Sequence, residues 1–395
     1  MGVLGSARAK AVIAGAADDV TPSGELEGSH RAIEMRMIKA ALDDAGLSIS
    51  DVDGFATCFG TSFFPSMDLA EYLGVTPRWT DTTQTGGSAF EVHVEHAAAA
   101  IAAGLCDVVV VTYLQTPRSA RKRGKRGFGG GGGGGRGPMH EWEAAYGGMM
   151  PPSAYALAAQ RHMHEFGTTS EQLAQIAVST REWAQLNPRA RYQEPLTIDE
   201  VLSSRMVSSP LHSLDCCLIT DGAGCVVLTS AERAKDLRKP PAYILGVGTS
   251  HTHSMISAMP DFTRTAGAVS GPQAFTMAGV TPAEVDVLQS YDSFTITVLL
   301  ALEDLGFVKK GEGGPFAASG ALGPGGSLPT NTNGGGLSYC HPGMYGMFLL
   351  VEAVRQLRGE AGPRQVDGAQ LAVAHGCGGV LSSTSTVVLG TEATV

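Results

Sequence analysis

The sequence predicts an α/β protein made of two similar halves, with helices covering both faces of a mixed, mostly parallel sheet. Helical and strand patterns alternate along the chain. Residues 31–45 have the pattern of an amphipathic helix, residues 89–103 that of an alanine-rich helix, and residues 108–112 that of a buried strand of β-branched residues. This alternation is typical of βαβ units, which build a parallel sheet covered on both faces.

Two segments of similar sequence indicate a duplication. Residues 45–53 and 278–286 align without a gap, and both contain a helix end, a glycine stop, a short turn and the start of a strand. Such junctions also recur by chance in α/β proteins. A helix-to-strand unit follows in each half, at residues 89–112 and 343–375, and it favours duplication over chance.

The boundary between the halves is expected near residue 238. The segment 228–241 carries charges and a Pro-Pro pair, which suits a connection. We therefore expect an N-terminal half over residues 1–238, with a loop insertion at about 115–205, and a C-terminal half over residues 239–395.

Composition limits the classes of function. Hydrophobic residues make up 43% of the 395 residues and charged residues 17%, which predicts a large buried core. The net charge of 28 − 38 = −10 disfavours a nucleic-acid partner. Since the sequence has neither a long run of apolar residues nor a secretory signal pattern, we expect a cytoplasmic protein without a membrane span.

The seven cysteines are expected to be reduced thiols, because disulfide frameworks belong mainly to short secreted chains. No two of them have CxxC spacing, so we expect no metal site.

A basic, glycine-rich stretch over residues 118–138 differs from the rest of the chain. Six arginines and lysines precede seven consecutive glycines, Gly129 to Gly135, and Arg136 follows. We expect no regular structure here. The stretch is either a solvated surface insertion or an electropositive lip for an anion such as a CoA phosphate, or for an acidic partner protein.

Three segments combine glycine with reactive side chains. The first, residues 82–90, is a turn that leads into the alanine-rich helix and contains Gly87 and Ser88. Ser88 is a candidate nucleophile, and the backbone amides are candidate oxyanion donors. The more ordinary role of Ser88, or of Thr85, is to cap the helix.

The second and third segments carry an imidazole and a thiol. Residues 331–342 contain Asn331, Gly335 and His341, and the following Pro342 fits the first turn of a helix over residues 343–358. His341 would then lie near a helix N-terminus, where its neutral form is favoured. Cys377 lies between glycines directly after a predicted strand at residues 371–374, so we expect the thiol to be accessible.

Residue blocks in these segments resemble those of thiolases, especially of the sterol carrier protein type. Residues 331–342 resemble the Asn-x-x-Gly-Gly…Gly-His-Pro block, and residues 375–379 (His-Gly-Cys-Gly-Gly) resemble the closing Cys-x-Gly-Gly block. Residues 291–294 (Tyr-Asp-Ser-Phe) resemble the Asn-Glu-Ala-Phe or His-Asp-Cys-Phe block, and residues 214–223 resemble the lipid-transfer branch. The four blocks have the same order as in thiolases, and the resemblance covers about residues 10–390.

The resemblance implies a duplicated thiolase fold, a five-layer αβαβα arrangement with two mixed, mostly parallel sheets and an inserted loop domain. It implies that His341 is a general base or oxyanion donor and that Cys377 moves the proton at the α-carbon of an acyl thioester. Asn331, Gly335, Gly379 and Gly87 are the expected substrate-binding or oxyanion positions.

The sequence departs from thiolases at two positions. The nucleophilic cysteine of that family falls on Gly87 here, beside Ser88, and no cysteine lies between Cys58 and Cys106. Serine is a poorer nucleophile unless a base activates it. Tyr291 stands where an amide or imidazole is usual, which resembles the thiolase-like aldolases of steroid side-chain degradation. A phenol held in the core by a hydrogen bond is the structural alternative for Tyr291.

These features predict an enzyme that makes or breaks a carbon–carbon bond beside a coenzyme A thioester, either by acyl transfer or by non-covalent retro-aldol cleavage of a β-hydroxyacyl-CoA. The alternative is a non-catalytic acyl-CoA or lipid-binding subunit that has lost its nucleophile. We expect no bound cofactor, since coenzyme A enters as part of the substrate. The resemblance further implies at least a homodimer and, in this branch, a small zinc-ribbon and OB-fold partner subunit.

Overall fold

The computed structural model describes residues 7–58, 63–124, 143, 146 and 151–395. Within these residues, nine strands form one mixed sheet in the order β3-β2-β4-β7-β1-β8-β11-β10-β9, and two more strands form a small hairpin. The strands are β1 (Ala11–Asp19), β2 (Gly54–Ala56), β3 (Trp79–Asp81), β4 (Val108–Gln115), β5 (Met206–Ser208), β6 (Leu211–His212), β7 (Gly222–Ser230), β8 (Ala242–His251), β9 (Val287–Ser290), β10 (Leu371–Gly378) and β11 (Ser383–Gly390).

The helices confirm the alternation predicted from the sequence. They are α1 (His30–Ala45), α2 (Pro65–Leu73), α3 (Ala89–Ala102), α4 (Pro117–Lys122), α5 (Pro152–Phe166), α6 (Ser170–Gln185), α7 (Ile198–Ser203), α8 (Ala231–Ala234), α9 (Gly267–Ala278), α10 (Thr295–Asp304), α11 (Gly313–Ala318) and α12 (Gly346–Leu357). Among the described residues, no helix is long and apolar enough to cross a membrane.

The same strand arrangement occurs twice in the sheet. In the first half β2 pairs with β4 in parallel, β4 with β7 antiparallel and β7 with β1 antiparallel; in the second half β9, β10, β11 and β8 pair in the same way. Phe55 pairs in parallel with Thr80, and Leu288 pairs in parallel with Thr330. Phe55 and Leu288 are as far apart in the chain as the two similar segments that begin at Ala45 and Ala278. The predicted duplication is confirmed.

The two halves of the sheet meet at β1 and β8, where the structure records two residue pairs, Val12 with Tyr243 and Ile13 with Ala242. The two predicted sheets are therefore continuous through this seam. The mixed character predicted from the sequence is confirmed, although antiparallel pairs outnumber the parallel ones that the sequence led us to expect. Parallel pairing lies at the outer strands β3, β2, β4, β10 and β9, and antiparallel pairing makes up the centre.

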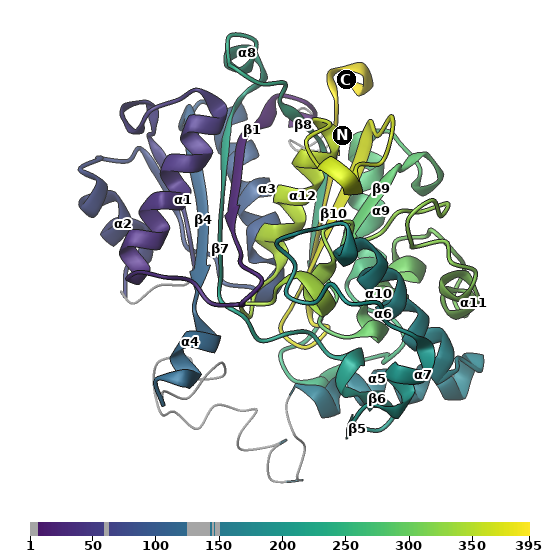
Figure 1. Ribbon diagram of the computed structural model, residues 1–395. Helices are drawn as coiled ribbons and strands as arrows, with labels where there is room; N and C mark the ends of the chain where they lie inside the picture. Colours follow the sequence, from purple (N-terminus) through teal and green to yellow (C-terminus); the bar gives the residue numbers. More distant parts are fainter. Residues whose placement is uncertain (1–6, 59–62, 125–142, 144–145, 147–150) are drawn as a thin grey trace.

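The helices complete five layers. Helix α1 packs on β1, β4 and β7, and α9 packs on β8 and β11, so each covers the outer face of one half. Helices α3 and α12 contact strands of both halves and each other, and they lie between the two halves at the centre of Figure 1. This is the αβαβα arrangement that the resemblance implies, and it buries most residues of the two central helices.

The segment between β4 and β7 carries α4 to α7 and the β5–β6 hairpin, on the lower side of the sheet in Figure 1. The expectation that residues 118–138 contain no regular structure is wrong at its start, because residues 118–122 belong to α4. Arg118 and Lys122 form ion pairs with Glu25 at 3.2 and 2.5 Å, which holds this short helix against the body. The glycine run and Arg136 lie outside the described residues.

Candidate active site

Tyr291 lies directly after β9, where the parallel pair β9–β10 ends. Its backbone N–H donates to the carbonyl oxygen of His375 at 2.9 Å, which continues the ladder by one residue, and its side chain is buried. The carboxyl ends of parallel strands are the usual place for reactive groups in α/β folds. The hydrogen bond to His375 therefore fixes Tyr291 at the edge of the sheet where the pairing of β9 and β10 ends.

His341 is also buried, and its backbone N–H donates to Oγ1 of Thr220 at 2.9 Å. The predicted helix start is wrong. Helix α12 begins at Gly346, because Gly343 has a φ of 111°, which interrupts any helix beginning at Pro342. The imidazole therefore sits in a turn that precedes the helix.

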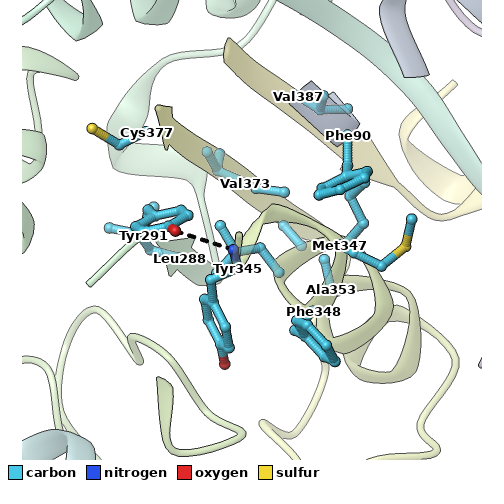
Figure 2. Packing of buried hydrophobic residues seen from close by; sticks show 14 of the residues in the cluster. Phe90, Leu288, Tyr291, Tyr345, Met347, Phe348, Ala353, Val373, Cys377 and Val387 are labelled. Atoms are coloured by element: carbon cyan, nitrogen blue, oxygen red, sulfur yellow. Dashed lines mark hydrogen bonds between the residues drawn. The ribbon is translucent and has the colours of Figure 1, made fainter. Parts of the chain in front are cut away.

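The side chains of Tyr291 and His341 meet edge to face. The phenol oxygen of Tyr291 lies 3.0 Å from Nε2 of His341 and 3.3 Å from the carbonyl oxygen of Gly343. The backbone N–H of Tyr345, at the start of α12, donates to the same phenol oxygen at 3.1 Å, the contact drawn in Figure 2. An amide at a helix N-terminus favours negative charge on its acceptor. The phenol oxygen thus has one fixed donor and two possible proton acceptors.

Burial controls the protonation of this pair. It lowers the pKa of His341 to about 4, so the imidazole is neutral at physiological pH. Burial also raises the pKa of the Tyr291 phenol well above its usual value, so the phenol keeps its proton in the resting protein. A neutral imidazole next to a protonated phenol can accept the phenol proton when a substrate oxygen supplies another.

Cys377 lies inside β10, which runs past the predicted strand end at residue 374, because Gly376, Cys377 and Gly378 pair with β11. The expectation of an accessible thiol is wrong, since only 3% of Cys377 is exposed. Burial raises the pKa of the thiol to about 12, while an amide hydrogen bond from Leu381 opposes this rise. The sulfur is therefore a neutral proton donor and not a resting thiolate.

Gly87, Tyr291 and Cys377 converge on one point. A β-carbon added to Gly87 would lie 2.2 Å from Cε2 of Tyr291 and 2.4 Å from the carbonyl oxygen of Cys377, so both atoms pack closely against the α-carbon of Gly87. In the view of Figure 2, Cys377 lies above the Tyr291 ring and its sulfur points away from the ring. The segments that carry the phenol, the thiol and the start of α3 form one site.

Ser88 lies at the start of α3, but its hydroxyl makes no helix cap. It donates to the carbonyl oxygen of Thr85 at 3.1 Å and lies 2.8 Å from Oγ of Ser383 on β11, which in turn lies 2.9 Å from Nδ1 of His251. The capping role considered for Ser88 is wrong, because these contacts turn the hydroxyl toward β11.

The glycines and the amide named from the sequence support the turns of the site. Oδ1 of Asn331 accepts the N–H of Ser290 at 2.8 Å, which joins its segment to the end of β9. Gly335 begins a tight turn, residues 335–339, with a φ of 59°. Gly379 begins the turn between β10 and β11 with a φ of 63°. Both glycines therefore have backbone conformations that other residues rarely adopt.

Two buried acids were missed in the sequence. The carboxylate of Asp292 accepts the N–H groups of Gly336 and Leu337 at 2.6 and 3.2 Å, so it organises the turn that leads to His341, and burial raises its pKa to about 7. Its place directly after Tyr291 was the available signal.

Glu91 on α3 is the second of these acids. It is fully buried, and both carboxyl oxygens lack a hydrogen-bond partner among the described residues. Burial raises its pKa to about 8. The signal was an acid in the first turn of an otherwise largely apolar, alanine-rich helix.

Comparison with known proteins agrees with this geometry. Residues 248–391 match the family model described as "Thiolase C-terminal domain-like". The chain is 35% identical over 347 residues to an acetyl-CoA acetyltransferase of Methanothermobacter thermautotrophicus, covering 86% of this chain and 88% of that protein. It is 35% identical over 367 residues to the 17-hydroxy-3-oxo-4-pregnene-20-carboxyl-CoA lyase of Mycobacterium tuberculosis, covering 90% and 92%.

A solved structure described as the Ltp2-ChsH2(DUF35) aldolase superposes with a TM-score of 0.85 at 32% identity, covering 98% of both chains. The likeness therefore extends over both halves and over the segment inserted into the first half. The chain belongs to the thiolase superfamily and is an enzyme of its acyltransferase or lyase type.

Proposed function

We propose that the protein cleaves the bond between the α- and β-carbons of a β-hydroxyacyl-CoA in a retro-aldol reaction without a covalent intermediate. The observation that carries this proposal is the buried hydrogen bond between Tyr291 and His341 beside Gly87, the position at which thiolases carry their nucleophile. A proton acceptor for a β-hydroxyl is therefore present, whereas a side chain that could take up an acyl group at residue 87 is not.

The reaction begins at the β-hydroxyl of the substrate. Its proton passes to the phenol oxygen of Tyr291 as the phenol proton moves to Nε2 of His341, and the amide of Tyr345 stabilises the charge that develops on the phenol oxygen. The β-carbon becomes a carbonyl, the bond between the α- and β-carbons breaks, and its electron pair forms the enolate of the shortened acyl-CoA.

Cys377 completes the reaction. Its neutral thiol gives a proton to the α-carbon of the enolate, and the proton released by the β-hydroxyl and held at His341 restores the thiol before the next turnover. The products are an aldehyde or ketone and a shorter acyl-CoA. In this proposal, Asn331 and the glycine turns at Gly335 and Gly379 shape the surface that receives the thioester carbonyl.

Acyl transfer through Ser88 is the second candidate. Ser88 adjoins Gly87, and Ser383 and His251 continue a chain of polar groups from its hydroxyl. That chain leads away from Tyr291, so an acyl group on Ser88 would be formed apart from the His341 imidazole. The position of the hydroxyl therefore favours the aldol reaction.

The relatives support the substrate class. One is named a carboxyl-CoA lyase and another an acetyl-CoA acetyltransferase, and both names contain a coenzyme A thioester. We accordingly propose an acyl-CoA substrate.

The assembly is proposed on two observations. The solved relative's description names two components, which supports a partner subunit; a small zinc-ribbon and OB-fold protein is the partner that the resemblance implies. A homodimer is supported by the outer edge of β3, which pairs with no strand among the described residues, and by an exposed apolar group in and beside helix α2, made of Phe63, Phe64, Met67 and Tyr72. A cytoplasmic location remains the prediction from the sequence.

The test is incubation of the purified protein with a β-hydroxyacyl-CoA, alone and with the candidate partner, and analysis of the products by mass spectrometry. We expect an aldehyde or ketone with a shortened acyl-CoA, no product from Cys377→Ala, and normal turnover of Cys106→Ala, a buried cysteine just beyond the other end of α3. Acylated Ser88 after incubation with acetoacetyl-CoA would favour the acyl-transfer mechanism. Binding of the acyl-CoA without turnover, both alone and with the partner, would favour a non-catalytic binding subunit.

A further inference from the structure

Position 87 requires glycine because neighbouring atoms leave no room for a side chain. Its φ lies outside the left-handed region, in contrast to the preceding Gly86 with a φ of 74°, so any residue could adopt the backbone conformation at position 87. What forbids a side chain is the surroundings: the three atoms nearest to an added β-carbon lie at 2.2, 2.4 and 2.6 Å, all shorter than real contacts.

Two of those three atoms belong to the Tyr291 ring. They are Cε2 at 2.2 Å and Cζ at 2.6 Å, and the third is the carbonyl oxygen of Cys377 at 2.4 Å. Cζ carries the phenol oxygen. A methyl group at position 87 would therefore displace the end of the ring that bears the hydroxyl.

The ring cannot move aside while keeping its contacts. The backbone of Tyr291 is tied to His375 by a 2.9 Å hydrogen bond, and the phenol oxygen is held by the amide of Tyr345 at 3.1 Å and by Nε2 of His341 at 3.0 Å. Tyrosine has only two side-chain torsions. With both ends fixed, contact with a larger residue at position 87 would break at least one of the bonds to the hydroxyl.

We propose that Gly87 is a positioning residue for the reaction: its bare α-carbon lets the Tyr291 ring occupy the space at the start of α3, and this places the phenol oxygen between His341 and the amide of Tyr345. The inference rests on the proposed function for its catalytic meaning. The structural part of the proposal is that residues 87 and 291 are sterically coupled. The catalytic part is that residue 87 affects the reaction only through the position of Tyr291.

The steric coupling is tested by thermal unfolding. Gly87→Ala is introduced into the wild type, into Tyr291→Phe, which keeps the ring, and into Tyr291→Ala, which removes it. The contact between the new methyl group and the Cys377 carbonyl is the same in all three backgrounds, so it cancels when the three changes in Tm are compared. We expect Gly87→Ala to lower Tm by about 2 °C or more in the wild-type and phenylalanine backgrounds, and by at most half as much in the alanine background.

An equal loss of Tm in all three backgrounds would overturn the proposal. Failure of Gly87→Ala to fold while Gly87→Ala/Tyr291→Ala folds supports it. Failure of both, with Tyr291→Ala alone folding, overturns it, because the Cys377 carbonyl and not the ring would then be the obstacle.

Turnover tests the catalytic part. We expect Gly87→Ala and Tyr291→Phe each to lower kcat about 100-fold with KM nearly unchanged, and the double variant to be about as slow as the slower single variant, because both act through one hydroxyl. Multiplied losses of about 10,000-fold would show that Gly87 acts independently of Tyr291, contrary to the proposal.

A matched control is Gly271→Ala on α9. Gly271 also has no left-handed φ, and an added β-carbon would lie 2.6 Å from Cδ2 of Leu305 in the outer layer. It should lose stability and keep its turnover. Lack of retro-aldol turnover in the wild type would refute the proposed function, while the unfolding measurements would still decide the coupling of residues 87 and 291.

Discussion

Oε2 of Glu91 occupies the space that a side chain at Gly376 would need: a β-carbon added there would lie 2.3 Å from this oxygen. Gly346, the first residue of α12, faces the same carboxyl, with a corresponding distance of 2.4 Å. The acid on α3 is thus enclosed by the two glycines that stand next to Cys377 and Tyr345.

This enclosure predicts a pH-dependent stability. Glu91 has a folded-state pKa of about 8 against 4.5 as its ordinary value, so the folded protein binds this proton more tightly than the unfolded chain does. The stability that results is fully present below pH 4.5 and is lost as the pH rises through 8. Between these values the free energy of unfolding should fall by up to about 1.4 kcal/mol per pH unit on account of this residue. Urea unfolding at pH 5 to 8 should show a flatter dependence for Glu91→Gln, and parallel curves for the two proteins would contradict this expectation.

The buried His341 predicts an unusual pH profile. With a pKa of about 4, the imidazole stays neutral far below the ordinary pKa of 6.5. The acidic limb of the kcat/KM profile, which reports the pKa values of the free enzyme, should therefore lie near pH 4, measured with a β-hydroxyacyl-CoA in buffers that keep the protein folded. An inflection near pH 6.5 that disappears in His341→Asn would show that the imidazole titrates as if exposed.

Asp292 should matter through the turn that carries His341. Replacement by alanine removes the acceptor of the Gly336 and Leu337 amides, and a displacement of about 1 Å at His341 would cost about 100-fold in kcat. The matched control is Asp286→Ala, since Asp286 accepts the amides of Gln370 and Leu371 at the opposite end of β10. Both variants should lose stability, but only Asp292→Ala should lose kcat. Equal losses of kcat would show that Asp292 does not position His341.

Cys377 should resist alkylation in the folded protein. Its pKa of about 12 leaves little thiolate at pH 7.5, and only 3% of the residue is exposed. Peptide mapping after iodoacetamide treatment should find Cys377 unmodified until the protein is unfolded in urea. Fast modification at pH 7.5 would mean that the thiol is ionised or open to solvent.

The sequence predicts the layers of the fold well because their signals are local. The periodicity of residues 31–45 and 89–103 marks α1 and α3 to within a residue at each end. The spacing between the two similar segments reappears in the equivalent strand positions of Phe55 and Leu288. These patterns depend on neighbours in sequence, which are visible without the fold.

The errors concern features set by distant contacts. The extension of β10 to Gly378 depends on pairing with β11, since the apolar run itself ends at Ala374. The start of α12 depends on the left-handed conformation of Gly343, which the preceding proline conceals. The reason for glycine at position 87 lies in the other half of the chain, in the ring of Tyr291.

The meeting of α3 and α12 has an evolutionary consequence. These helices hold equivalent places in the two repeats, and their first turns touch: a β-carbon on Gly346 would lie 2.4 Å from the carbonyl oxygen of Gly87. A symmetric ancestor assembled from two identical subunits would have had to accept every substitution on both sides of this junction at once. In a single chain the two positions can differ, and here they do: position 87 has no side chain, while the amide of Tyr345 before α12 donates to the phenol of Tyr291.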